Sequence, residues 1–160
     1  MNPSYSANLV AFLDMIPVSE LGAGLIAVSD RGYNVIVGST AAAPILFDSY
    51  ADHPRRTIFL PSIQNWSSAA GRYQILARYF DAYRVQLHLP DFGPDSQDAI
   101  AVQLIHECGA LQMIEGGAIA AAIAACSSRW ASFPGAAYGQ HVNKIDALLL
   151  SFTSAGGDLA

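Results

Sequence analysis

Hydrophobic residues near the start of the chain recur with the spacing of one helical face. They stand at positions i, i+3, i+4 and i+7, and they are Leu9, Phe12, Leu13 and Ile16. This period predicts a helix over Asn2–Ile16. Proline has no N–H to donate to the carbonyl four residues earlier, so we expect Pro17 to end or bend this helix.

The hydrophobic pattern changes between residues 21 and 70, where glycines interrupt any helical period. Tyr33–Val37 is rich in residues that favour strands and has glycine on both sides, so it predicts a strand. Thr57–Leu60, closed by Pro61, predicts a second one. The connection between them, Ser39–Arg56, is long, and loops of this length in a compact domain are usually functional or mobile.

A helical period returns from Gly71 onward. A stripe of apolar positions precedes the proline-rich break at Pro90–Pro94, and it consists of Tyr73, Leu76, Tyr79, Phe80, Tyr83 and Leu87. Three further helices are predicted, over about Asp95–Gly109, Gly117–Trp130 and Asn143–Thr153. The second of these is alanine-rich and almost uncharged, so we expect it to be buried on all sides.

This order of elements predicts an α+β fold with segregated elements. We expect one domain over residues 1–160, with a β lobe at about 21–70 and a helical lobe formed by 1–20 and 71–160. A cleft between two such lobes suits a polymeric substrate.

Composition narrows the class of protein. The 160 residues are 52% hydrophobic and 13% charged, which excludes intrinsic disorder. The charge-free apolar stretches are shorter than the roughly 20 residues that a membrane span needs, so no membrane insertion is expected. The net charge is −5 and basic residues cluster no further than Arg55–Arg56, which argues against nucleic-acid binding.

Cysteine and histidine usage indicates neither a disulfide framework nor a metal site. Cys108 and Cys126 are expected to be reduced, buried and packed as small hydrophobes. The four histidines are widely scattered without a metal-binding spacing. We therefore expect no metal and no cofactor. The N-terminus lacks the basic start of a secretory signal, so we expect synthesis in the cytoplasm without a signal peptide.

Glu20 is the first candidate for chemistry. It is one of only three glutamates and follows the first predicted helix at the junction with the β lobe. Burial between lobes would raise the pKa of its carboxyl group, as a general acid near neutral pH requires. The plain alternative is a solvated glutamate at a helix end.

The segment Ser67–Gln74 is the second candidate. Its small residues allow a polymer to approach the backbone closely, and Tyr73 and Gln74 offer polar groups for sugar hydroxyls. Taken alone, the same segment indicates only a small-residue loop that caps a helix.

The chain resembles the lambda-type phage endolysins, also called phage lysozymes. In order and spacing the resemblance covers roughly residues 9–157. It rests on Ala11–Met15 with Ser19-Glu20, Gly32–Gly38, Ala70–Gln74 and Trp130–Gln140, together with Tyr50–Arg55 and Ser96–Ala99.

This resemblance implies a lysozyme-like fold and cleavage of the β-1,4 bond between N-acetylmuramic acid and N-acetylglucosamine in peptidoglycan. It implies that Glu20 is catalytic. It further implies a substrate-binding set comprising Asn34, Asp52, His53, Ser68, Tyr73, Gln74, Tyr138 and Gln140. Such an enzyme would act in the periplasm on the cell wall, after release from the host cytoplasm by a separate pore-forming protein.

The chain departs from the family pattern at Asn34, where relatives can carry aspartate, at Pro17, and in the uncharged alanine-rich segment. Without a second carboxylate at position 34, the resemblance favours a lytic transglycosylase that forms 1,6-anhydromuramic ends. The alternative is a hydrolytic muramidase in which Asp30 or Asp48 positions water. A non-catalytic glycan-binding module is a further alternative, against which the presence of Glu20 argues.

Overall fold

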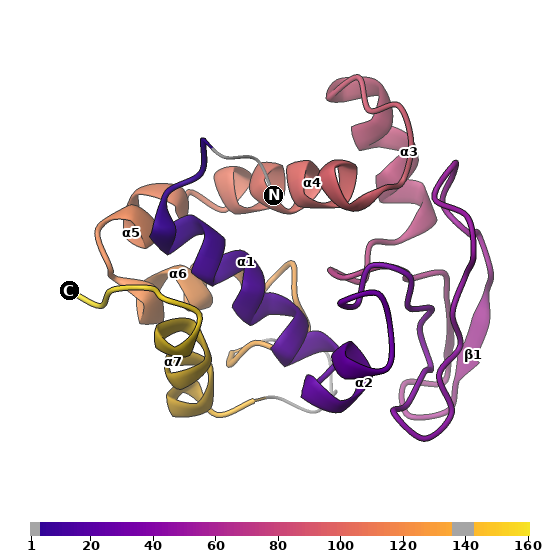
Figure 1. Cartoon of the computed structure of the whole chain (residues 1–160), viewed down its shortest axis with the longest axis horizontal. Coiled ribbons are helices and arrows are strands. Elements are labelled where there is room, and N and C mark those ends of the chain that lie inside the picture. The colour runs from indigo at the N-terminus through magenta and orange to yellow at the C-terminus, as the bar shows by residue number, and fades with distance from the viewer. Residues whose placement is uncertain (1–3, 136–142) are drawn as a thin grey trace. The chain divides into compact units, whose positions relative to one another are not determined.

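The structure, a computed structural model, describes residues 4–135 and 143–160 (Figure 1). Its contacts form two compact units: unit 1 comprises Met1–Glu20 and Ala101–Ala160, and unit 2 comprises Leu21–Ile100. The first boundary lies where the change of pattern predicts a lobe to begin. The second lies at residue 100, so residues 71–100 belong to the same unit as the β-rich segment.

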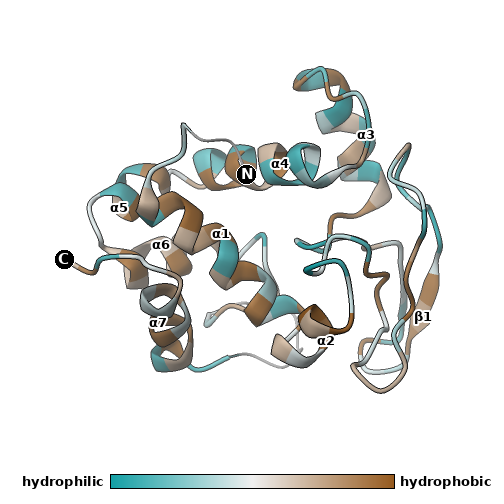
Figure 2. Ribbon diagram, in the orientation of Figure 1, coloured by the Kyte–Doolittle hydropathy of each residue, from teal (hydrophilic) through white to brown (hydrophobic). Residues whose placement is uncertain are grey.

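Unit 1 is helical. It contains α1 (Ala7–Glu20), α5 (Leu111–Glu115), α6 (Ile119–Cys126) and α7 (Ile145–Ser154), together with the end of α4 (Pro94–Glu107). Helix α1 contacts both α5 and α7, and α6 contacts the same two helices. Figure 2 shows α1 mainly in the brown of hydrophobic residues, as expected for the central helix of this unit. Its fully buried side chains include Phe12, Leu13, Met15 and Ile16.

Pro17 does not end the first helix, so the expectation that the helix ends there was wrong. Helix α1 continues through a buried Pro17 to Glu20. The missing N–H removes one backbone hydrogen bond, but the last turn is held by tertiary contacts instead. Asn143 donates through Nδ2 to the backbone oxygen of Ser19 at 3.1 Å. These contacts explain how the helix tolerates an internal proline.

The predicted alanine-rich helix, Gly117–Trp130, is the shorter helix α6, which follows α5 after a turn at Gly116 and Gly117. Gly117 has a φ of +74°, which ends helical geometry. Helix α6 buries only one face, through Ile119, Ala122, Ile123 and Cys126. The expectation of burial on all sides was therefore wrong, because the remaining alanines face solvent.

Both cysteines are free thiols, as predicted. Cys126 is buried, whereas Cys108 is only half-buried and lies within hydrogen-bonding reach of the Cys126 thiol. Burial and this neighbour raise the pKa of Cys126. The expectation that both thiols are buried therefore holds for Cys126 alone.

Unit 2 is built around short extended segments. It contains α2 (Ala23–Ala27), the antiparallel strands β1 (Ile58–Leu60) and β2 (Asn65–Ser67), α3 (Ala77–Gln86) and the beginning of α4. The prediction of a strand at Thr57–Leu60 is confirmed. Tyr33–Val37 forms only isolated bridges, Val35 to Leu46 and Ile36 to Ala70. The flanking Gly32 and Gly38 have positive φ angles and turn the chain before a longer ladder can form.

Gln97, at the start of α4, joins three segments of unit 2. Its side-chain oxygen accepts from the backbone N–H of Arg72 at 2.9 Å. Its amide group donates to the backbone oxygens of Tyr33 at 3.0 Å and Phe92 at 2.8 Å. Gly71 makes this approach possible, since a Cβ there would lie 2.2 Å from the Gln97 side-chain oxygen.

Replacing Gln97 with leucine is expected to destabilise the protein. The substitution leaves three buried backbone groups without these partners, and each costs about 1–3 kcal/mol. Gln103→Leu is the matched control on the same helix, where the side chain makes only an exposed contact with Glu107. Chemical denaturation should show a large loss for Gln97→Leu and a change within about 0.5 kcal/mol for Gln103→Leu. Equal effects of the two would contradict the role given to Gln97.

Candidate functional site

Glu20 is the last residue of α1, and its carboxylate meets a distant segment of unit 1. Its Oε1 atom accepts from the hydroxyl of Ser132 at 2.6 Å and from the backbone N–H of the same residue at 3.4 Å. Ser132 itself is 8% exposed. The sequence separation of these partners is 112 residues, so the site depends on tertiary folding of unit 1.

A chain of hydrogen bonds converges on this carboxylate. The hydroxyls of Ser19 and Ser132 lie 2.7 Å apart, and Asn143 donates to the Ser19 hydroxyl at 3.0 Å. When Glu20 is ionised, its carboxylate can only accept, so the Ser132 hydroxyl must donate its one proton to it. Ser19 must then donate to Ser132, so every donor in the chain points towards Glu20.

Two opposed effects set the pKa of Glu20. Burial is the larger effect and raises the pKa above the ordinary value of 4.5. The side-chain and backbone hydrogen bonds from Ser132 lower it in part, because they stabilise the ionised form. The pKa of this carboxyl group is thus higher than that of a solvated glutamate, which favours the protonated form that a general acid needs.

His53, which the resemblance assigns to substrate binding, is a core residue of unit 2. Its ring is 3% exposed and packs against Phe80 and Phe92. The backbone N–H of Arg55 donates to Nδ1 at 3.0 Å, so the proton lies on Nε2, which donates to the backbone oxygen of Ile75 at 2.9 Å. Burial lowers the pKa of His53. Both ring nitrogens are therefore used within the protein, which fits a packing role.

Tyr73 is likewise buried, at 2% exposure. Its hydroxyl donates to Oδ1 of Asp98 at 2.7 Å, and the hydroxyl of Tyr33 donates to the same atom at 2.8 Å. Burial and the nearby Asp98 carboxylate raise the pKa of Tyr73 well above its usual value. In the structure, the tyrosine hydroxyl is therefore a buried contact within unit 2.

The other predicted substrate residues of unit 2 are half-buried and make local contacts. The hydroxyl of Ser68 accepts from the backbone N–H of Ala77 at the start of α3. Gln74 donates to the backbone oxygen of Gly71 at 3.0 Å. The side-chain oxygen of Asn34 accepts from the backbone N–H of Asp30 at 2.9 Å. His53 bonds to Ile75, so the segments around residues 53 and 74 lie side by side.

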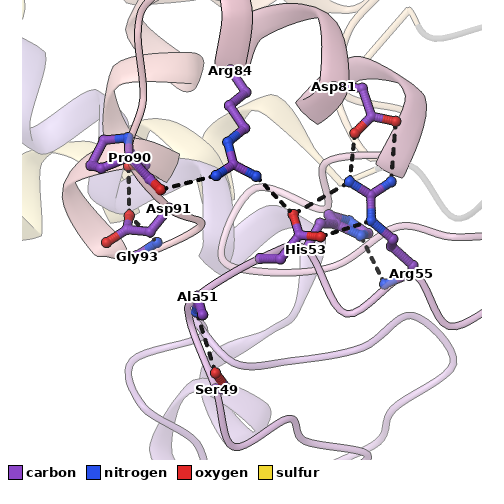
Figure 3. Close-up of polar contacts among 11 residues, drawn as sticks. Ser49, Ala51, His53, Arg55, Asp81, Arg84, Pro90, Asp91 and Gly93 are labelled. Carbon is purple, nitrogen blue, oxygen red and sulfur yellow. Dashed lines mark hydrogen bonds and ion pairs between the residues drawn. The ribbon is translucent and has the colours of Figure 1, made fainter.

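Asp52 belongs to an ion-pair network on the surface of unit 2. Figure 3 labels the other members of this network, Arg55, Asp81 and Arg84. Arg55 contacts Asp52 at 3.0 Å and Asp81 at 2.6 Å, and Arg84 contacts Asp52 at 3.4 Å. The Arg55 hydrogen bonds lower the pKa of Asp52. Arg84 also donates to the backbone oxygen of Pro90 at 3.2 Å, so this network ties the 52–55 loop to α3 and its exit.

Tyr138 and Gln140 lie outside the described residues. Sequence reasoning did not single out Ser19, Ser132 or Asn143 as functional. Ser19 and Ser132 stand within stretches that carry the family resemblance, which was the available signal. Within residues 4–135 and 143–160, no group of three or more His, Cys, Asp or Glu side chains could hold a metal ion. No helix in those same ranges is long and apolar enough to cross a membrane.

Comparison with known proteins extends the resemblance noted in the sequence. The Endolysin family model matches residues 10–159. The chain is 51% identical to the endolysin of Escherichia phage lambda over 149 residues, covering 92% of this chain and 90% of that protein. It is 45% identical to the endolysin of Escherichia phage P2 over 154 residues, covering 94% and 93%.

Solved structures agree with this result. Bacteriophage lambda lysozyme in complex with a chitohexasaccharide matches with a TM-score of 0.90 at 46% identity, covering 99% of this chain and 100% of that one. A second structure of bacteriophage lambda lysozyme matches with a TM-score of 0.85 at 45% identity, with the same coverage. The predicted lysozyme-like α+β fold is thereby confirmed. On these sequence and structural matches, the chain belongs to the Endolysin family.

Proposed function

We propose that this protein is an endolysin that degrades bacterial peptidoglycan as a lytic transglycosylase, with Glu20 as its acid and base. The bond cleaved is the β-1,4 link between N-acetylmuramic acid and N-acetylglucosamine. The observation that carries the proposal is the Glu20 carboxyl group, whose pKa is raised by burial while Ser132 holds one of its oxygens at 2.6 Å. The structural relatives of this protein include a lysozyme solved in complex with a chitohexasaccharide. This relative supports a glycan as the substrate.

In the proposed reaction, the protonated Glu20 gives its proton to the glycosidic oxygen, and the bond from that oxygen to C1 of the muramic residue breaks. The resulting carboxylate then takes the proton of the C6 hydroxyl of the same muramic residue. The freed O6 attacks C1 and forms the 1,6-anhydro ring. The nucleophile is part of the substrate, so its effective concentration is high and no second carboxylate is required.

The hydrogen-bond chain through Asn143, Ser19 and Ser132 supports both steps. Because Ser132 occupies Oε1, we assign the transferable proton to Oε2. Burial keeps that proton in place before the first step, and the Ser132 hydroxyl stabilises the carboxylate formed by it. The same three residues fix the orientation of the carboxyl group at the end of α1.

We further propose that the enzyme is made in the host cytoplasm and reaches the cell wall through a pore formed by another protein. Produced alone in a Gram-negative host, the protein should leave culture turbidity unchanged until the inner membrane is permeabilised with chloroform, after which turbidity falls. The Glu20→Gln variant should not clear the culture after the same treatment. Rapid lysis without permeabilisation would contradict the need for a separate pore.

Glu20→Gln should lower clearing of purified murein by at least about a hundredfold, the scale expected for loss of a general acid. The variant keeps the side-chain oxygen that accepts from Ser132, so its fold should be intact. Glu115→Gln is the matched control, because Glu115 is an exposed carboxylate of the same unit that accepts from Ser6. Near-normal clearing by Glu20→Gln would remove Glu20 from the mechanism.

The same variant should be more stable than the native protein at pH 7 but not at pH 4. The folded-state pKa of Glu20 is raised above 4.5, so its contribution to stability is present at low pH. That contribution is lost as the pH rises through the folded-state pKa, whereas glutamine does not ionise. Thermal unfolding at the two pH values measures this difference.

Ser132→Ala should move the alkaline limb of the pH–activity profile upward by about one pH unit, the scale of one hydrogen bond to a charged group. Without the hydroxyl, the ionised form of Glu20 loses stabilisation and its pKa rises. Ser132→Thr keeps a hydroxyl and should restore the limb. Ser127→Ala, which removes only an exposed contact to Ala124, should leave the limb unchanged. An unmoved limb in Ser132→Ala would show that Ser132 does not tune the acid.

The reaction product distinguishes transglycosylation from hydrolysis. We expect muropeptides that end in 1,6-anhydro-N-acetylmuramic acid, lack a reducing end and are one water lighter than hydrolysis products. Digestion in heavy-oxygen water should leave these ends unlabelled in mass spectra. Labelled reducing ends would identify a hydrolase. Asp30, which accepts from the Tyr50 hydroxyl at 2.6 Å, and the exposed Asp48 would then be the residues to test as water-positioning groups.

A further inference from the structure

The hairpin of β1 and β2 presents an aromatic pair to solvent. Phe59 lies directly opposite Trp66 in the antiparallel register. Their ring centroids are 5.4 Å apart and the ring planes meet at 61°, an edge-to-face arrangement. Trp66 is 63% exposed and Phe59 40% exposed. A large part of the indole surface is therefore open.

The opposite face of the same hairpin is packed. Ile58 and Leu60 alternate with Phe59 and are half-buried. A Cβ at Gly38 would lie 3.2 Å from the Ile58 side chain and 3.9 Å from that of Leu60, so these residues pack over the Gly38 turn. The hairpin thus already has a buried face, and its aromatic face is not needed for the core. An exposed apolar pair of this kind is typical of a binding surface.

The surroundings of the pair indicate an uncharged ligand. Residues 57–71 contain no Asp, Glu, Lys, Arg or His. A phosphate-rich polymer or an anionic lipid surface would call for basic side chains here. Residues near Trp66 along the chain carry hydroxyl and amide groups instead, and they are Gln64, Asn65 and Ser67. Aromatic faces carry negative charge density and attract the polarised C–H groups on the apolar face of a sugar ring, while amides and hydroxyls suit its polar edge.

The pair is also continuous with the segment to which the family resemblance assigns substrate contacts. Strand β2 ends at Ser67, and Ser68 and Gln74 follow along the chain. The segment is held in place by backbone pairing, since Ala70 bridges both Ile36 and Ile75. Ser67 accepts from the backbone N–H of Ala69, which fixes the exit of the strand. Trp66 therefore belongs to the same ordered part of unit 2.

We propose that Trp66, backed by Phe59, is an accessory glycan subsite on which an uncharged N-acetylhexosamine ring of the glycan strand stacks. The ligand class rests on the proposed function, because it takes the substrate to be a glycan strand. The subsite contributes to binding of long strands and not to bond cleavage, since neither ring carries an acid or a base. Truncation should therefore raise KM for long strands and leave kcat unchanged.

Fluorescence gives a direct test, because the chain has two tryptophans and Trp130 is buried. In a Glu20→Gln, Trp130→Phe protein, Trp66 is the only indole. Titration with N-acetylchitohexaose should shift its emission to the blue and protect it from acrylamide quenching. Binding that leaves the Trp66 emission unchanged would overturn the proposal. If the Trp130→Phe protein is unfolded, acrylamide protection in Glu20→Gln alone gives the same answer, because the exposed indole dominates quenching.

Calorimetry on variants in the Glu20→Gln background completes the test. Trp66→Ala should bind N-acetylchitohexaose about fivefold more weakly, the scale of a lost aromatic contact, and Trp66→Tyr should bind nearly as well as the parent. Tyr79→Ala is the control, because Tyr79 is an exposed aromatic residue on α3 of the same unit. Unchanged affinity in Trp66→Ala, or a loss equalled by Tyr79→Ala, would overturn the subsite.

The two proposals fail in different ways. A protein that cleaves murein through Glu20 but shows no Trp66 response would keep the proposed function and lose the subsite. A Trp66 response in a protein whose Glu20→Gln variant still cleaves would keep the subsite and lose the catalytic assignment. If Trp66→Ala alters only the sedimentation behaviour and not the glycan affinity, the pair is a contact between copies and the subsite is again overturned.

Discussion

The hydrogen bonds from Ser132 to Glu20 are the interaction on which the proposed catalytic centre depends. A carboxylate on the last residue of a helix lies at the negative end of the helix dipole, and here it is also largely removed from water. Both conditions disfavour the ionised form. Ser132 offsets them with two donors, its hydroxyl and its backbone N–H, on a single carboxylate oxygen. The acid can exist in both protonation states only because this distant segment folds against the end of α1.

This balance agrees with a reaction in which one group first gives and then takes a proton. A fully solvated glutamate would be ionised at neutral pH and could not start the reaction, whereas a buried one without donors would hold its proton too tightly to give it to the glycosidic oxygen. The directed chain from Asn143 through Ser19 to Ser132 supplies the donors without adding a charged residue. With a nucleophile provided by the substrate, such a centre needs no second carboxylate.

Sequence periodicity predicted the elements whose stability is local and failed where tertiary contacts decide. The strand at 57–60 and the helix beginning near residue 95 follow from residue preference and from acidic residues in a first turn. Pro17 was misjudged because a local rule ignores the tertiary hydrogen bonds that hold Ser19 and Glu20. The 117–130 helix was misjudged because alanine favours a helix whether it is buried or exposed, so composition alone could not indicate that α6 buries one face.

Candidate site residues show the same division. Glu20 was selected as a candidate from its position and from the family motif, but its hydrogen-bond partner Ser132 was not, because nothing local links residues 20 and 132. His53 and Tyr73 stand in family motifs, yet their polar atoms form hydrogen bonds within the protein. His53 bonds to the backbone of Ile75 and Arg55, and Tyr73 bonds to Asp98. A residue in a family motif can serve a buried polar network as well as a substrate contact, because both uses require a particular polar side chain.

Under the proposed function, this use of polar groups within the protein constrains how unit 2 binds a neutral polymer. The side chains of Ser68 and Gln74 each form a hydrogen bond with the backbone. Asp52 forms ion pairs with two arginines. Hydrogen bonds to sugar hydroxyls replace equally good bonds to water. They therefore orient the sugar more than they strengthen its binding. Affinity for an uncharged ring must then come from apolar surface removed from water, and the open indole of Trp66 supplies such a surface beside these residues in the chain.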